Sequence, residues 1–283
     1  MKADQPSATA YRVAMRRAAH QVLDEPKVLD DPIALRIVGP RGEASIRSDP
    51  RRFQSRFGRV LRAFLVARSR CAEDALGVAV AAGLRQYVVL GAGLDTFAYR
   101  NPYAAQGLRV FEVDHPATQD WKRALLGKVR IEEPASLTFV PVDFETQRLP
   151  ERLSACGFQA DAPVYFSWLG VVMYLTRETV MATLAYIAGR PAGSGITFDY
   201  LVPPSSLPFL RRIGFWFMSR RVAAAGEPWR TWFDPVTLAR DLRGLGFTRL
   251  EDLDGPALDA RYFGGRAPGL RGRSAGHVMT ATK

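Results

Sequence analysis

The feature that most constrains the fold is a short apolar run that ends in a glycine-rich turn. Residues 86–90 read Gln-Tyr-Val-Val-Leu, and Gly91-Ala92-Gly93 follow at once. β-Branched and aromatic residues in a run of this length are typical of a strand buried on both faces. Glycines directly after such a strand let the backbone approach a ligand where a Cβ atom would clash. A plain tight turn uses the same two glycines, so the rest of the chain decides between the two interpretations.

Similar runs recur along the rest of the chain, and helical periodicity separates them. The runs cover residues 109–113, 137–142, 164–166, 195–199, 248–253 and 277–282. The helical patterns cover residues 117–128, 147–156, 177–189 and 235–245. Strands that alternate with helices predict right-handed βαβ crossovers and a mostly parallel sheet with helices on both faces. We therefore expect a Rossmann-like α/β core over residues 83–283, with the glycine turn opening its next helix.

The first 82 residues carry no strand pattern. Residues 7–23 have helical periodicity, and a short helix is expected after Asp31-Pro32, through Val38, because proline suits the first helical position. Residues 39–50 are rich in glycine, proline and charge and are expected to form a loop, and residues 52–82 a long helix. The sequence predicts that residues 1–82 form a helical cap on the sheet domain.

An insertion in the sheet domain is expected at residues 203–230. Three prolines precede an aromatic run at 209–218, and two arginines follow it. The run is too short to cross a bilayer, which takes about 20 apolar residues. We interpret the segment as a lid over a ligand pocket, with a helix lying on a membrane surface as the alternative.

Composition excludes several classes of partner. The net charge is +11, but only five of the 39 basic residues are lysines, and the arginines are spread along the whole chain instead of forming one basic stripe. We therefore expect neither nucleic-acid nor membrane binding. Cys71 and Cys156 form no CxxC pair, and the three histidines are scattered, so no metal site is expected. Reduced thiols and the absence of an apolar segment near Met1 predict a cytoplasmic protein.

Acidic residues stand at the ends of the second and third predicted strands. Asp114 lies 21 residues beyond Gly93, the spacing at which an acid reaches ribose hydroxyls in Rossmann-like sites. Glu112 lies on the same side of the strand and is a second candidate for binding the ribose. The alternative is that Asp114 is a plain surface acid ahead of the next helix. Asp143 can accept from an adenine amino group, while the backbone N–H of Phe144 donates to the ring.

Arg68 lies close to the apolar stripe of the long N-terminal helix, so its side chain is expected to point inward. A buried guanidinium needs an anionic partner. The carboxylate of a bound cofactor would serve, and an ion pair with a core acid such as Asp95 is the alternative.

These motifs together resemble the bacterial S-adenosylmethionine-dependent methyltransferases related to the leucine carboxyl methyltransferase family. The resemblance covers nearly the whole chain. It rests on residues 90–100 (Leu-Gly-Ala-Gly-Leu-Asp-Thr-Phe-Ala-Tyr-Arg), 111–116 (Phe-Glu-Val-Asp-His-Pro), 140–143, 67–74, 173–175, 31–34 and 261–266.

The resemblance implies a class I methyltransferase fold with a seven-stranded sheet, and S-adenosyl-L-methionine as the cofactor. By it, Arg68 holds the cofactor carboxylate, the turn of Gly91, Ala92 and Gly93 holds the methionine part, Asp114 the ribose, and Asp143 with Phe144 the adenine. The chain departs from the family pattern in one place. Leu169 stands after the fourth strand where the family often has a glutamate, a change that could reshape the acceptor pocket together with Trp168.

The activity expected from this resemblance is O-methylation of a small-molecule or C-terminal carboxylate, or of a hydroxyl, by in-line transfer. The acceptor-site candidates are Tyr174, Tyr200, Arg261 and Tyr262. An NAD(P)-dependent oxidoreductase is the main alternative, although the third glycine of GxGxxG is replaced by Thr96. A protein that binds the cofactor without catalysis is the other. The sequence leaves the acceptor and the oligomeric state open.

Overall fold

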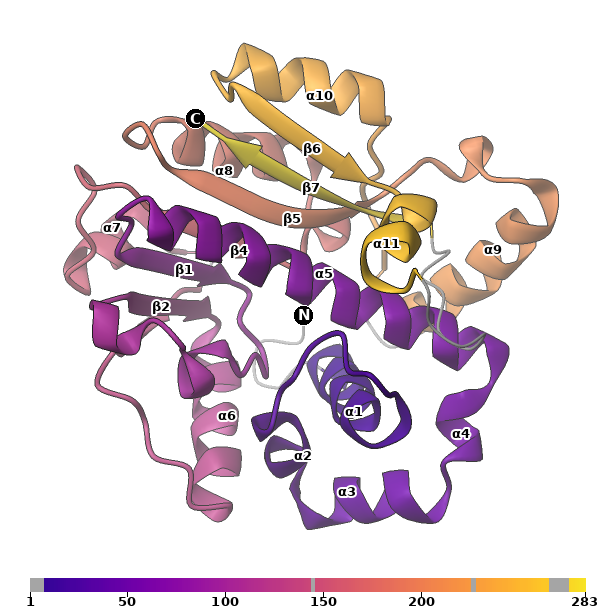
Figure 1. Cartoon of the computed structure of the whole chain (residues 1–283). Coiled ribbons are helices and arrows are strands. Elements are labelled where there is room, and N and C mark those ends of the chain that lie inside the picture. Colours follow the sequence, from indigo (N-terminus) through magenta and orange to yellow (C-terminus); the bar gives the residue numbers. More distant parts are fainter. Residues whose placement is uncertain (1–7, 144–145, 225–227, 265–274) are drawn as a thin grey trace.

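A seven-stranded sheet with the order β3-β2-β1-β4-β5-β7-β6 forms the centre of the molecule (Figure 1). The computed structural model describes residues 8–143, 146–224, 228–264 and 275–283. Neighbouring strands from β3 to β5 are parallel, whereas β7 is antiparallel to both β5 and β6. The strands are β1 (Gln86–Leu90), β2 (Arg109–Asp114), β3 (Leu137–Pro141), β4 (Tyr165–Trp168), β5 (Gly195–Leu201), β6 (Arg249–Leu253) and β7 (Gly276–Thr282). The predicted mostly parallel α/β sheet is confirmed.

Helices cover both faces of the sheet, which explains why β1 has no polar face. Val88 and Leu90 pack into a core that includes apolar residues of α8 and α10. Tyr87 and Val89 point to the opposite face and pack with residues of α5. All five residues of β1 are buried, as a central parallel strand requires. The covering helices are α5 (Arg56–Ala81), α6 (Pro116–Lys128), α7 (Leu149–Ala155), α8 (Arg177–Ala188) and α10 (Pro235–Gly244).

The strand order reverses direction at β1. The chain steps from β1 to β2 and β3 on one side, and then returns to β4 and β5 on the other. Loops leave the carboxyl ends of β1 and β4 in opposite directions at such a point, which opens the crevice where α/β sheets bind ligands. The fold therefore places the glycine turn after β1 at the expected ligand site.

The N-terminal segment is helical where the structure describes it, but one predicted loop is wrong. Residues 39–50 were expected to be irregular, yet α3 (Gly39–Ser48) occupies most of them. Proline at position 40 lies in the first turn, where its missing N–H costs nothing, and Ile46 is fully buried among apolar residues of α1 and α2. The other N-terminal helices are α1 (Ala8–Leu23), α2 (Ile33–Ile37) and α4 (Arg51–Gln54).

The long helix α5 joins the N-terminal helices to the sheet. It begins after Ser55, whose hydroxyl caps it by accepting from the N–H of Gly58. It contacts α1 at one side and runs across β4, β5 and β7, as Figure 1 shows. A short helix, α11 (Gly255–Tyr262), packs on it through Leu258. The division of the chain at residue 82 stays a prediction.

Residues 203–230 contain a short turn, η4 (Pro204–Ser206), and α9 (Phe209–Ala224), which projects at the right of Figure 1. The segment that returns from α9 is tied to the core, because the N–H of Arg230 donates to the carbonyl of Met173 at 2.7 Å. In the part of the chain that the structure describes, no helix has the length and apolarity to cross a bilayer. The lid, the cytoplasmic location and the absence of nucleic-acid and membrane partners stay predictions.

Candidate functional site

The turn after β1 requires glycine at two positions. Gly91 and Gly93 have φ angles of +65° and +49°, which side chains with a Cβ atom rarely adopt. A Cβ atom on Gly91 would also overlap the side chain of Val171, which follows β4. The prediction that this turn opens an α-helix is wrong, because two short 3-10 helices, η1 (Phe97–Arg100) and η2 (Ala104–Gln106), follow it before β2. The hydroxyl of Thr96, directly before η1, forms hydrogen bonds with side chains of the N-terminal segment. The chain that follows the glycine turn therefore runs toward the N-terminal helices.

Asp114 ends β2 and lies against the glycine turn. One carboxylate oxygen accepts from the backbone N–H of Gly93 at 2.5 Å, and the other accepts from the N–H of His115 at 2.7 Å. Burial raises the pKa of Asp114, and the two backbone N–H bonds act in the opposite direction. A carboxylate has about four acceptor positions, so Asp114 can still accept from hydroxyl groups of a ligand.

Glu112, the second candidate for binding the ribose, has a partner inside the protein. Its carboxylate accepts from the ammonium of Lys122 on α6 at 2.6 Å, and both side chains are 1% exposed. Burial raises the pKa of Glu112, and the Lys122 ammonium opposes that effect. Asp114 lines the cavity described below, whereas Glu112 does not.

Asp143 follows β3 at the same edge of the sheet. Its side chain accepts from the hydroxyl of Thr146 at 2.9 Å, and its backbone N–H donates to the side-chain oxygen of Gln147 at 3.1 Å. These two bonds fix the start of the next loop and hold the carboxylate at the carboxyl end of β3. Phe144, the predicted partner of Asp143, lies outside the described residues.

A cavity of about 550 Å³ opens at the carboxyl ends of β1 and β4. Its volume is in the range of pockets that hold compact organic ligands. The predicted site residues that line it are Arg68, Gly91, Ala92, Gly93, Asp114, Asp143 and Tyr174. Residues far apart in the sequence, from α5, the glycine turn and the ends of β2 and β3, therefore meet at one site.

Arg68 lines this cavity from α5 and pairs with a core acid, the alternative that the sequence left open, but the acid is Asp199 and not Asp95. The side chain is 7% exposed, and its Nη1 donates to the carboxylate of Asp199 on β5 at 2.7 Å. Asp95, the predicted core acid, pairs with Arg17 instead. The Nε of Arg68 is buried and has no hydrogen-bond partner among the described residues. Because the guanidinium stands in the cavity wall, it is suited to an anionic ligand such as a carboxylate.

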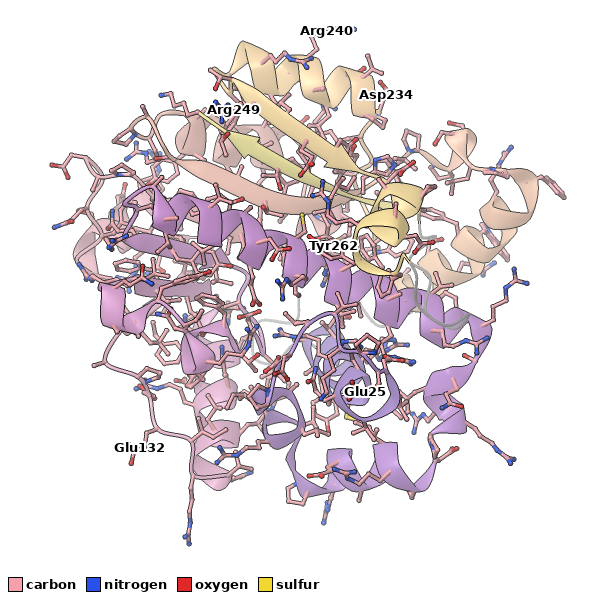
Figure 2. The ribbon with its side chains drawn as sticks, in the orientation of Figure 1. Glu25, Glu132, Asp234, Arg240, Arg249 and Tyr262 are labelled. Carbon is pink, nitrogen blue, oxygen red and sulfur yellow. The ribbon has the colours of Figure 1, made fainter. Side chains whose placement is uncertain are left out.

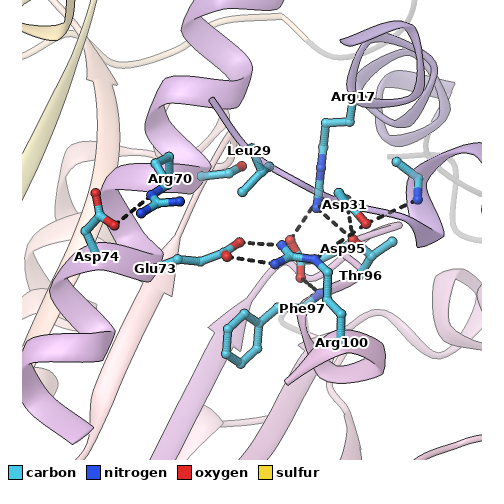
Figure 3. A network of polar contacts seen from close by, with 12 residues as sticks. Arg17, Leu29, Asp31, Arg70, Glu73, Asp74, Asp95, Thr96, Phe97 and Arg100 are labelled. Atoms are coloured by element: carbon cyan, nitrogen blue, oxygen red, sulfur yellow. Dashed lines mark hydrogen bonds and ion pairs between the residues drawn. The ribbon is translucent and has the colours of Figure 1, made fainter. Parts of the chain in front are cut away.

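A network of ion pairs lies beside the glycine turn and was missed from the sequence (Figure 3). Arg17 of α1 donates to Asp31 at 2.7 Å and to Asp95 at 3.0 Å. Arg100 of η1 pairs with Glu73 of α5 at 2.7 Å and lies 3.4 Å from Asp31. Burial favours the neutral acid at Asp95, but Arg17 and neighbouring cations outweigh it and lower its pKa. The network fixes α1, α5 and η1 around one end of the cavity, which Arg17, Glu73 and Asp95 line.

The segment after β4 forms a further wall. Leu169, Gly170 and Tyr174 line the cavity, so the departure from the family pattern falls on the cavity surface. Trp168 does not line it, because its side chain is 4% exposed and packs in the apolar core under β4. Of the two residues suspected of reshaping the pocket, the structure places Leu169 at the cavity and Trp168 behind it.

Three of the four acceptor-site candidates lie away from the cavity. The hydroxyl of Tyr200 donates to Asp252 at 2.7 Å inside the sheet domain. Arg261 pairs with Glu251 at 2.8 Å, and the hydroxyl of Tyr262 donates to Asp74 at 3.1 Å. Figure 2 shows Tyr262 on α11, on the outer side of α5. Tyr200 and the two α11 residues have internal partners, so the structure brings only Tyr174 to the cavity.

The cysteines and histidines form no metal centre in the described ranges. Cys71 is buried and Cys156 half-buried, and both are free thiols. Burial raises the pKa of Cys71. Within those ranges no group of three or more candidate ligands gathers. The expectation of no metal site stays a prediction for the whole chain.

Comparison with known proteins identifies the family. The model of the family described as leucine carboxyl methyltransferase matches residues 10–188, more than half of the chain. The chain belongs to the leucine carboxyl methyltransferase family. A protein of Bacillus subtilis (strain 168), YktD, is 30% identical over 304 residues and spans 100% of both chains. Its name describes it provisionally as an S-adenosyl-L-methionine-dependent methyltransferase. The expectation of an S-adenosylmethionine-dependent methyltransferase is thereby confirmed at the level of the family.

Solved structures agree on the fold. A crystal structure provisionally described as a methyltransferase, from Thermobifida fusca YX, has a TM-score of 0.58 at 17% identity and covers 100% of this chain and 96% of its own. A DUF574 family protein from Streptomyces avermitilis MA-4680 has a TM-score of 0.55 at 18% identity, covering 95% and 97%. At these identities the likeness confirms the class I methyltransferase fold and nothing finer.

Proposed function

We propose that this methyltransferase transfers the methyl group of S-adenosylmethionine to a carboxylate oxygen of a small molecule or a peptide C-terminus. The observation that carries this proposal is Arg230 in the cavity wall beside Tyr174. The other arginines of the wall, Arg17 and Arg68, are paired with acids. Arg230 has no acidic partner within the residues that the structure describes. A guanidinium binds a carboxylate in a two-point geometry that suits an anionic acceptor.

The acids at the strand ends support one orientation of the cofactor. Asp143 lies at the end of β3 and would accept from the adenine amino group. Asp114 lies at the end of β2 and would accept from the ribose hydroxyls. Gly91 and Gly93 then leave room for the methionine part at the end of β1, and the guanidinium of Arg68 would donate to its carboxylate. This orientation would leave the wall that contains Tyr174 and Arg230 to the acceptor.

The cofactor supplies an electrophilic methyl group bound to a positively charged sulfur. The protein's contribution is mainly to hold the two reactants in line and to exclude water. A carboxylate is already ionised at neutral pH and needs no general base, whereas a phenol would benefit from one. The wall between β4 and α8 presents Leu169, Val171, Tyr174 and Leu175. These four side chains include no carboxylate or imidazole that could act as a general base, which fits an acceptor that arrives already ionised.

The geometry of the turn favours this cofactor over a dinucleotide. Rossmann dinucleotide sites place the pyrophosphate at the N-terminus of the helix that directly follows the glycine turn. Here η1 follows the turn, and the next α-helix, α6, comes only after β2. An NAD(P) molecule would therefore lack its usual anion-binding helix end, and we expect no measurable affinity for NADH.

The test is transfer of a labelled methyl group from S-adenosylmethionine to a small-molecule extract, followed by mild alkali. A carboxyl methyl ester releases its label under this treatment, and a phenolic ether retains it. Alkali-stable label on oxygen would contradict the carboxylate assignment, and label on nitrogen would contradict O-methylation altogether. Binding of NADH without binding of S-adenosylmethionine would contradict the cofactor as well.

Two arginine variants separate acceptor recognition from general charge. Arg230→Gln should raise the KM for the labelled acceptor while leaving the dissociation constant for S-adenosylhomocysteine unchanged, and Arg230→Lys should restore part of the loss. Arg240, an exposed arginine on α10 labelled in Figure 2, provides the matched control Arg240→Gln with no expected effect. An unchanged KM in Arg230→Gln would remove the observation on which the carboxylate assignment rests.

A further inference from the structure

Asp199 lies behind the cavity and bonds to two of its wall elements at once. Its side chain is fully buried on β5. One oxygen accepts from Nη1 of Arg68 at 2.7 Å, and the other accepts from the backbone N–H of Gly170 at 2.5 Å. Arg68 and Gly170 line the cavity, whereas Asp199 does not. The carboxylate therefore links α5 to the segment after β4 without itself facing a ligand.

Contact between these two wall elements is close. Gly170 has a φ of +76°, and a Cβ atom on it would lie 2.8 Å from Nη2 of Arg68. The guanidinium is thus packed on the backbone of Gly170, and both groups are fixed by the same carboxylate. Asp199 holds Nη1, and the guanidinium thereby keeps its place in the cavity wall.

The position of Arg68 depends on this single acid. Four carboxylates line the same cavity. Glu73 and Asp95 are paired with Arg100 and Arg17, and Asp114 and Asp143 accept from neighbouring N–H and hydroxyl groups. Without Asp199, no other residue that the structure describes pairs with this buried cation, and a buried unpaired charge is strongly unfavourable. Its side chain would then turn toward Glu73, Asp95 or water and leave the place where a ligand carboxylate binds.

We propose that Asp199 is a positioning residue for the amino-acid part of the cofactor. It holds Arg68 in the cavity wall, where the guanidinium would meet the cofactor carboxylate, and it fixes the Gly170 backbone against that guanidinium. This inference rests on the cofactor orientation proposed above. It predicts a specific energetic signature, because Asp199 supports recognition of the carboxylate and has no part in recognition of the adenosine.

Two ligands separate these contributions. S-Adenosylhomocysteine carries both the adenosine and the amino-acid part, whereas 5′-methylthioadenosine carries the adenosine and a thioether but no carboxylate. The ratio of their dissociation constants measures how much the amino-acid part contributes. Calorimetry on the wild type should give much tighter binding of S-adenosylhomocysteine.

In Asp199→Asn, the dissociation constant for S-adenosylhomocysteine should rise roughly 10- to 100-fold, the range for losing a charge-assisted hydrogen bond. That for 5′-methylthioadenosine should stay within about twofold of wild type. The asparagine keeps an oxygen that can accept from Gly170, so the backbone contact survives. Gly170→Ala tests the same idea with Asp199 intact, because its methyl group displaces the guanidinium, and it decides the matter if Asp199→Asn does not fold.

Thr197→Val is the matched control on β5. Thr197 is buried on the same side of the strand and bonds to Tyr165, but it does not line the cavity. Any loss in this variant should affect both ligands equally. Equal weakening of both ligands in Asp199→Asn, or unchanged or tighter binding of S-adenosylhomocysteine, would overturn the assignment. A wild type that binds neither ligand would instead refute the proposed cofactor site, so the two failures are distinguishable.

Discussion

Replacement of Asp114 by asparagine tests the cofactor orientation at the ribose. The carboxylate now accepts two backbone N–H groups, those of Gly93 and His115, one on each oxygen. An asparagine has one acceptor oxygen and one NH2 group of nearly the same shape. One of the two backbone N–H groups must therefore face another donor, and a ribose hydroxyl loses an ionised acceptor.

Both consequences have an expected size. A buried N–H that loses its partner costs about 1–3 kcal/mol of folding free energy. Loss of the charge-assisted bond to the ribose costs about 1.5–3 kcal/mol of binding free energy, which corresponds to a roughly 10- to 160-fold rise in the dissociation constant. The variant should thus be somewhat less stable and much weaker in binding.

The assay is calorimetric titration with S-adenosylhomocysteine, combined with thermal unfolding of the ligand-free protein. Asp252→Asn is the control, because Asp252 likewise accepts two hydrogen bonds, both on one oxygen and from the side chains of Tyr200 and His277, but does not line the cavity. It should lower the melting temperature and leave the affinity unchanged. A folded Asp114→Asn that binds S-adenosylhomocysteine within twofold of wild type would refute the assigned role of Asp114.

Three further predictions follow from the network, the turn and the α9 segment. Arg17→Met leaves the fully buried Asp31 without its closest cation, and should lower the free energy of unfolding in urea by about 3–5 kcal/mol. Arg70→Met, which breaks the exposed pair of Arg70 and Asp74, is the control and should lower that free energy by no more than about 1 kcal/mol. Gly91→Ala should destabilise the fold and abolish S-adenosylhomocysteine binding. The control is Gly127→Ala on α6, where a methyl group meets open space, and it should leave the stability of the fold unchanged or raise it by up to about 1 kcal/mol. Normal binding by Gly91→Ala would contradict the close contact with Val171. Proteolysis within residues 203–230 should slow when S-adenosylhomocysteine and acceptor are bound; unchanged cleavage, or tight binding to anionic vesicles, would favour the membrane-surface interpretation.

The sheet was predictable because its signals are local. The β1 residues are apolar on both faces, and the spacing from Gly93 to Asp114 is set by one crossover, so short stretches of sequence carried that information. Local composition misled at residues 39–48, where glycine and proline indicated a loop but the burial of Ile46 supports a helix. Tertiary packing, which no local pattern records, decided that segment.

The ion pairs were not predictable for a related reason. Arg68 and Asp199 are 131 positions apart, and Arg17 and Asp95 are 78 apart. Which acid meets which arginine depends on how the crossovers stack α5 and α1 on the sheet. One signal was nevertheless available: Asp199 is an acid inside an otherwise apolar strand run, and a buried acid of this kind requires a cationic or N–H partner. Among the core acids, the sequence interpretation named Asp95 instead.

The antiparallel strand β7 has a consequence for the order in which the sheet is built. β6 precedes β7 in the chain, yet β7 occupies the place beside β5 and β6 takes the edge. β6 and β7 must therefore join the sheet together as a pair, or β7 must join before β6, in the reverse of their order along the chain. An intermediate that contains β1 to β5 alone exposes the whole edge of β5, and unpaired edges recruit strands from other molecules. Refolding at high concentration should lose material mainly at this step, through pairing of β5 edges between two chains before residues 276–282 arrive.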